Sequence, residues 1–161
     1  MAYSTALLIH SSVRWIILAI LLTALIKSLA GWMKKLPFSG VDRVLQIALT
    51  SWVDMEVLVG LFLYWMSPLT PKSGEQMSAA MKVPSLRFFA VEHQVLMILA
   101  LIALHVGSVL SRRAEIPPHK HRRWFAGLAL TLVLMVLGIP WSRAVPGMKG
   151  DPMSHSTLSS R

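Results

Sequence analysis

The chain has 161 residues, of which 55% are hydrophobic and only 14% are charged, and its formal net charge is +9. This composition excludes an ordinary soluble domain and favours an integral membrane protein. The chain has no cysteine, which excludes disulfides, iron–sulfur clusters, thiolate ligation of haem and covalent haem attachment.

Four apolar segments are long enough to cross a hydrocarbon core, which takes about 20 residues in a helix. They are Ala6–Gly31, Val41–Met66, Phe88–Ser111 and Trp124–Pro140. The connections between them contain proline and glycine, which interrupt helices. We therefore expect an all-α fold, an integral membrane four-helix bundle within residues 1–142. Residues 143–161 are polar and rich in Gly, Pro and Ser, and we expect a mobile tail there.

Basic residues gather in two of the connections. The sequence "RRAEIPPHKHRR" (residues 112–123) joins the third and fourth segments, and Lys34, Lys35 and Arg43 mark the first connection. The positive-inside rule makes both connections cytoplasmic, so both termini and the Pro68–Arg87 connection face outward. The net charge is then an orientation signal, and we expect a lipid bilayer and no nucleic acid as partner. The first apolar run is too long for a secretory signal, so we expect a retained helix.

Several ionisable residues lie inside the predicted spans, where a charge costs roughly 3 kcal/mol on insertion scales. The most conspicuous are His10, Arg14, Asp54, Glu56, Glu92, His93 and His105. Such residues need a partner or a function, so they are the candidates for a site.

Two of these histidines fall at similar depth on segments that run in the same direction. With a rise of about 1.5 Å per residue, His10 lies ~6 Å and His93 ~8 Å below the outer ends of their helices. Facing imidazoles on two helices are a way for a bundle to hold haem b. We interpret the pair as axial ligands of one haem iron; the alternative is that each only forms hydrogen bonds.

Arg14 lies one turn below His10 and projects to the same side of the helix. Its guanidinium could pair with a haem propionate, with a quinone oxygen or with Glu92. A purely structural pair between Arg14 and Glu92 is the alternative interpretation.

Asp54 and Glu56 lie near the middle of the second span. They are two residues apart and point about 200° away from each other, so they do not form one paired-carboxylate site. Glu56 shares a face with Gly60 and Tyr64, which indicates the bundle interior. Either acid could relay protons or bond a quinone; the alternative is a hydrogen bond from a protonated acid to another helix.

Two further residues of the third segment are weaker candidates. His105 is ~18 Å deeper than His93 and about 120° round the helix, so it belongs to a different place, and we expect it to bond a neighbouring helix. Met97 could ligate a metal, but methionine in such a helix is typically a packing residue. His119 and His121 fall in the basic connection, where we expect solvated side chains.

Four motifs resemble a group of small four-helix bacterial membrane proteins labelled cytochrome b-like. They are "HSSVRW" (His10–Trp15), "VGLFLYWMSP" (Val59–Pro68), "VEHQVLMILA" (Val91–Ala100) and "LGIPW" (Leu137–Trp141). The resemblance implies a multi-pass protein of the bacterial inner membrane with haem b held by His10, Arg14 and His93. The chain departs from it at Asp54-Met55-Glu56, where many relatives carry His-x-Gln.

These observations together predict a haem b-binding electron-transfer protein or redox-complex subunit that exchanges electrons with a quinone or another membrane redox subunit. Its enzymatic role would be at most that of an electron-transfer subunit, and we assign no catalytic residue. A cofactor-free accessory subunit of a larger membrane complex is the alternative. A proton- or metal-handling membrane component is a weaker alternative. Transporters commonly move one internal repeat against another, and these four helices show no repeat.

Overall fold

The computed structural model describes residues 2–67 and 70–141, and every regular element within these ranges is a helix. The predicted all-α fold is therefore confirmed for the described part of the chain. The predicted mobile tail, residues 143–161, lies outside the described residues.

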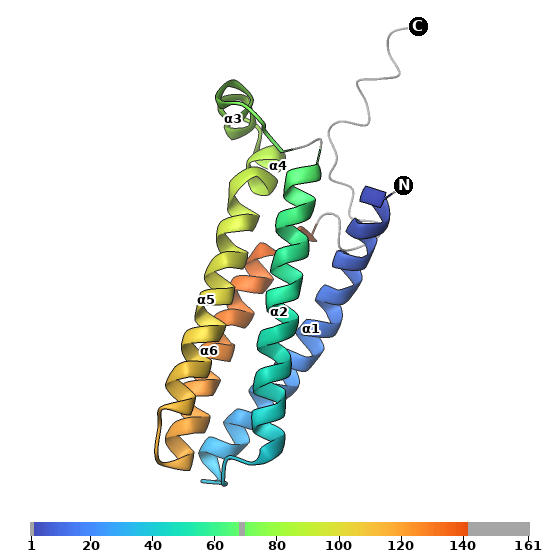
Figure 1. Ribbon diagram of the computed structural model, residues 1–161. Helices are drawn as coiled ribbons and strands as arrows, with labels where there is room; N and C mark the ends of the chain where they lie inside the picture. Colours follow the sequence, from blue (N-terminus) through green and yellow to red (C-terminus); the bar gives the residue numbers. More distant parts are fainter. Residues whose placement is uncertain (1, 68–69, 142–161) are drawn as a thin grey trace, which may run out of the picture.

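Four long helices pack side by side (Figure 1). They are α1 (Ala2–Met33), α2 (Gly40–Met66), α5 (His93–Arg112) and α6 (Pro117–Gly138). Around the molecule the order is α2, α1, α6 and α5, and α5 in turn contacts α2. The contact between α5 and α6 is the most extensive of the four, and the contact between α2 and α5 is the least extensive.

Three helical stretches are long and apolar enough to cross a membrane: Tyr3–Met33, Gly40–Met66 and Pro84–Arg112. This finding supports a membrane protein and agrees with three of the four predicted spans. The described helix α6 is not among them, since it begins before the predicted Trp124 and includes the basic residues of the connection in its first turns.

The connection after α2 is itself partly helical, which the sequence analysis does not predict. A short helix, α3 (Gly74–Met81), is followed by α4 (Pro84–Arg87) and by a π-helical segment, η1 (Phe88–Glu92), which runs directly into α5. Proline is favoured in a first helical turn because its φ is already helical. The third predicted span therefore begins four residues before the expected Phe88, at Pro84.

The two basic connections lie at the same end of the molecule (Figure 1). The amino terminus and the segment from α2 to α5 lie at the opposite end. The helices therefore alternate in direction along the chain, which is the geometry that short connections impose on neighbouring helices.

Apolar side chains from all four long helices meet between them. The most deeply buried members of this core include Ile17, Leu21, Leu49, Leu104, Trp124 and Leu128. On α5 and α6 two glycines bring the backbones together: a Cβ atom added to Gly127 would lie 2.6 Å from the Cα atom of Gly107. Such close approach through small residues is a common basis of helix packing in membranes.

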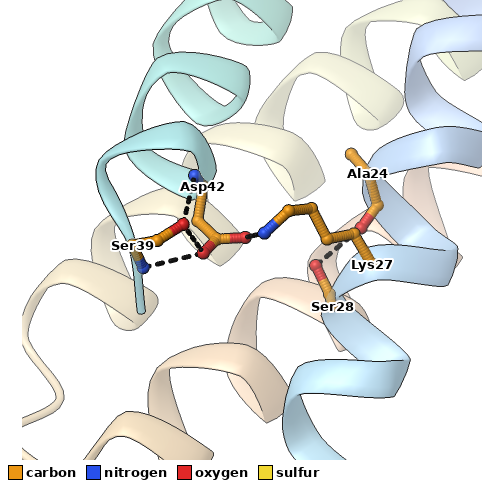
Figure 2. Close-up of polar contacts among 5 residues, drawn as sticks. All are labelled: Ala24, Lys27, Ser28, Ser39 and Asp42. Atoms are coloured by element: carbon orange, nitrogen blue, oxygen red, sulfur yellow. Dashed lines mark hydrogen bonds and ion pairs between the residues drawn. The ribbon is translucent and has the colours of Figure 1, made fainter. Parts of the chain in front are cut away.

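A polar clamp joins the ends of α1 and α2 at the end that carries the basic connections (Figure 2). Ser39 and Asp42 form a capping box, in which the Ser39 side chain accepts from the Asp42 N–H and the Asp42 carboxylate accepts from the Ser39 N–H. Nζ of Lys27 lies 2.5 Å from Oδ1 of the same carboxylate. The cap that starts α2 is thereby tied to the last turns of α1.

Candidate functional site

His10 and His93, which the sequence places at similar depth, line the same cavity. This cavity has a volume of about 450 Å³ and lies between α1, α2 and η1–α5, toward the end of the molecule opposite the basic connections. Its wall mixes apolar and polar side chains: Tyr3, Leu7, His10, Ser11, Ser12, Arg14, Trp15, Gly60, Leu63, Tyr64, Ser67, Thr70, Phe89, His93, Gln94 and Pro140. Its size is within the range of small-molecule sites, which is about 300–1,000 Å³.

The ring of His93 is held by the carboxyl-terminal end of α6. Its Nδ1 atom lies 2.7 Å from the carbonyl oxygen of Gly138. A carbonyl only accepts hydrogen bonds, so Nδ1 carries the proton and Nε2 retains its lone pair. The carbonyl belongs to the last turn of a helix, where no N–H of that helix is available for it.

The π-helical segment η1 sets the rotation of the helix immediately before His93. The His93 N–H bonds to the carbonyl of Phe88, five residues earlier. Tyr64 of α2 donates a hydrogen bond of 3.3 Å to the carbonyl of Ala90 inside this segment. Single π turns inside α-helices occur frequently at functional sites.

His10 contacts a carboxylate of the neighbouring helix α2. Its Nδ1 atom lies 3.0 Å from Oε1 of Glu56, and the two side chains are only 17% and 12% exposed. The distance between these two atoms is that of an ion pair, but their angles do not meet the geometry of a hydrogen bond. Gly60, one turn above, leaves room for the ring, since a Cβ atom there would be 3.3 Å from Cε1 of His10. Glu56 thus stands beside Nδ1, and Nε2 is the nitrogen left for another contact.

A smaller cavity of about 30 Å³ adjoins the same two rings. His10, Glu56, Gly60 and His93 contribute to its wall. It is large enough for one water molecule. Both imidazoles therefore line two cavities.

Arg14 lines the larger cavity and lacks the partner considered for it. Its Nε atom is buried and forms no hydrogen bond with a described residue, and its guanidinium lies 5.4 Å from the centre of the Trp15 ring. Glu92 instead accepts a hydrogen bond of 2.6 Å from Nε of Arg87. The alternative of a structural Arg14–Glu92 pair is therefore wrong, because Arg87 lies nearer on the same helical stretch.

Of the other candidates, Asp54 and His105 lie away from the two cavities, and Met97 lies at the smaller one. Nε2 of His105 is 2.7 Å from Oδ1 of Asp54, so these two residues bond α5 to α2 away from both cavities. The methyl group of Met97 lies where a side chain at Gly138 would begin, which makes it a packing contact between α5 and α6. Met97 also lines the smaller cavity.

The side chain of His121 is buried, although its position in the basic connection predicts a solvated side chain. It is 1% exposed, and neither ring nitrogen has a hydrogen-bond partner among the described residues. Its ring packs 5.0 Å from that of Phe38 and against Gly31. The expectation of a solvated side chain is wrong because α6 begins at Pro117, so position 121 is already helical. Its spacing of three and seven residues from the buried Trp124 and Leu128 is the signal that could have revealed it.

No group of three or more His, Asp or Glu side chains that could hold a free metal ion occurs among residues 2–67 and 70–141. The donor set at the larger cavity consists of two histidines, each with one ring nitrogen beside an acceptor. Such acceptors are the usual partners of ligating histidines, because they fix the ring and the tautomer.

Comparisons of the chain with protein-family models, with curated proteins and with solved structures find no match. The resemblance to cytochrome b-like proteins therefore depends on the quoted motifs alone.

Proposed function

We propose that this chain is an integral membrane four-helix bundle with both termini on the outer, periplasmic side of a bacterial inner membrane. Three candidate spans support this proposal, and α6 would be the fourth. The position of both basic connections at one end also supports it, because the positive-inside rule places that end in the cytoplasm.

Within this bundle, the larger cavity would hold one haem b between His10 and His93. The single observation that carries the proposal is that both rings stand on this cavity with Nδ1 facing an acceptor, Glu56 for His10 and the Gly138 carbonyl for His93. Ligation of the iron would require each ring to be neutral and to offer the lone pair of Nε2, which is the donor set of bis-histidine haem ligation. The donor set and the mixed polar and apolar wall fit this group.

Haem would supply one-electron redox chemistry, while the chain binds and orients it and excludes water. Arg14 would pair with a propionate or a quinone oxygen, which would give its buried Nε atom a partner. The protein would then pass electrons between a quinone and another membrane redox subunit.

The test is the reduced-minus-oxidised optical spectrum of the purified protein, with one variant for each histidine. We expect a b-type spectrum that His10→Ala and His93→Ala each abolish, while His105→Ala retains it. His105 is a matched control, because it lies on the same helix as His93 and away from the cavity. Circular dichroism checks that each variant remains helical.

The alternative, a cofactor-free accessory subunit, has an observation in its favour. The contacts of His10 with Glu56 and of His93 with Gly138 already join α1 to α2 and α5 to α6. Protein purified with its native partners and free of haem would support this alternative and reject the haem proposal. A proton- or metal-handling component, the weaker alternative, would use Asp54, Glu56 and His105, of which Asp54 and His105 are bonded to each other and Glu56 lies beside His10.

A further inference from the structure

Asp54 and His105 form a polar pair that faces out of the helix packing. The pair joins α2 to α5 along the least extensive of the four helix contacts. The side chains are 43% and 44% exposed, and neither lines one of the two cavities described above. The pair therefore presents its remaining polar atoms to whatever surrounds the molecule.

The surroundings of this pair are mostly apolar. Its exposed neighbours three, four or seven residues away on α2 and α5 are Ser51 and Arg112 and five apolar residues, Ile47, Leu58, Leu61, Ile98 and Ile102. Lipid tails offer no hydrogen bonds, and ionisable residues inside membranes almost always face protein or water. A half-exposed carboxylate and imidazole among lipid-facing side chains therefore indicate a surface that another protein covers.

We propose that this face of α2 and α5 is the contact between two copies of the chain in the membrane. The contact between Nε2 and Oδ1 leaves Nδ1 of His105 and Oδ2 of Asp54 for other contacts, in which a protonated Nδ1 would donate and Oδ2 would accept. Each copy thus offers one donor and one acceptor at the same place. The surface is complementary to itself.

Insertion in a membrane brings the two complementary surfaces to the same depth. Two copies inserted in the same orientation form a symmetric dimer about an axis along the membrane normal, so residues of equal depth meet. Asp54 and His105 are in contact and therefore share one depth. The donor of each copy then meets the acceptor of the other, and the flanking apolar side chains pack around them. The inference rests on the proposed membrane insertion and not on haem.

Single cysteines can test the contact, because the natural chain has none. Ile102→Cys places a thiol on the proposed face, and Leu130→Cys places one on α6. These positions are matched in exposure, at 51% and 54%. They are also matched in depth, since the hydroxyl of the adjacent Thr131 bonds the carbonyl of Ala100.

We expect oxidation of the purified protein in phospholipid vesicles, at a low ratio of protein to lipid, to convert Ile102→Cys to a disulfide-linked dimer and to leave Leu130→Cys monomeric. Adding Asp54→Ala and His105→Ala to the Ile102→Cys chain should lower the dimer yield about tenfold, since two hydrogen bonds between helices are lost. Circular dichroism of each variant confirms that it is helical.

Leu58→Cys provides a second reporter on α2. Equal yields from both faces would indicate random collision, and the absence of a dimer from both Ile102→Cys and Leu58→Cys would indicate a monomer; either result overturns the proposal. The haem spectrum is recorded on the same samples. A dimer without haem rejects only the proposed function, and a monomer with haem rejects only the dimer.

Discussion

The two histidines of the cavity differ in what holds their rings. His93 donates to a backbone carbonyl, which no substitution at Gly138 removes, whereas His10 depends on the carboxylate of Glu56. Ligating histidines commonly have such partners, and their loss weakens the bound group. The role of Glu56 is therefore open to a direct test.

We expect Glu56→Ala to lower the affinity for haem about 10- to 100-fold, the usual effect of removing a partner of a ligating histidine. The matched control is Asp54→Ala, two residues away on the same helix but bonded to His105. Haem titration of the haem-free protein measures both affinities. Equal losses in the two variants would contradict this role of Glu56.

Counting residues along two helices places His10 and His93 at similar heights, and the structure brings both to one cavity. The expected bond from His105 to a neighbouring helix is also present, with Asp54 of α2 as its partner. The contact of His10 with Glu56 depends on the rotation of α1 and α2 about their own axes. A count of residues along one helix does not contain that rotation.

Among the elements, the pair α5 and α6 is joined most closely. Their backbones meet at Gly107 and Gly127, where a side chain on either residue would collide with the backbone of the other. Close packing of this kind makes added volume costly, typically about 1–3 kcal/mol per overpacked site.

Gly127→Ala should therefore lower the free energy of unfolding by about 1–3 kcal/mol, even though alanine is the better helix former. Gly40→Ala is the control, because a Cβ atom at this first residue of α2 meets no atom within 4 Å. Thermal unfolding in detergent, followed by circular dichroism, compares the two. An unchanged midpoint for Gly127→Ala would contradict the close approach.

The elements were predicted well where their composition is distinctive and poorly where packing decides their ends. The second span, Val41–Met66, agrees with α2 to within one residue because Ser39 and Asp42 cap its start. The π-helical segment η1 has no recognised signal in the apolar run "FFAVE". The early start of α6 at Pro117 was missed because its first turns are basic.

For the whole molecule, the proposed orientation follows from two facts together. The basic residues lie in the connections from α1 to α2 and from α5 to α6, and both connections are at one end. In this proposed orientation the larger cavity, which lies toward the opposite end, would stand in the outer half of the membrane.

We expect a membrane-impermeant maleimide, applied to intact spheroplasts, to label Glu75→Cys in α3 and to leave Glu115→Cys unlabelled. Both residues are exposed glutamates, and their replacement leaves the basic residues of the connections intact. Permeabilised cells provide the control, in which both variants should react. Labelling of Glu115→Cys in intact spheroplasts would reverse the proposed orientation.

The sequence by itself determined the helical class and most of the limits of the candidate spans, because these depend on local composition and on the rise per residue. Only the tertiary structure decided the partners: Glu56 beside His10, Arg87 with Glu92, and His105 with Asp54. The physical reason is that partners depend on how each helix is rotated toward its neighbours. That rotation is set by packing, as at the two glycines of α5 and α6, and by the π-helical segment before His93.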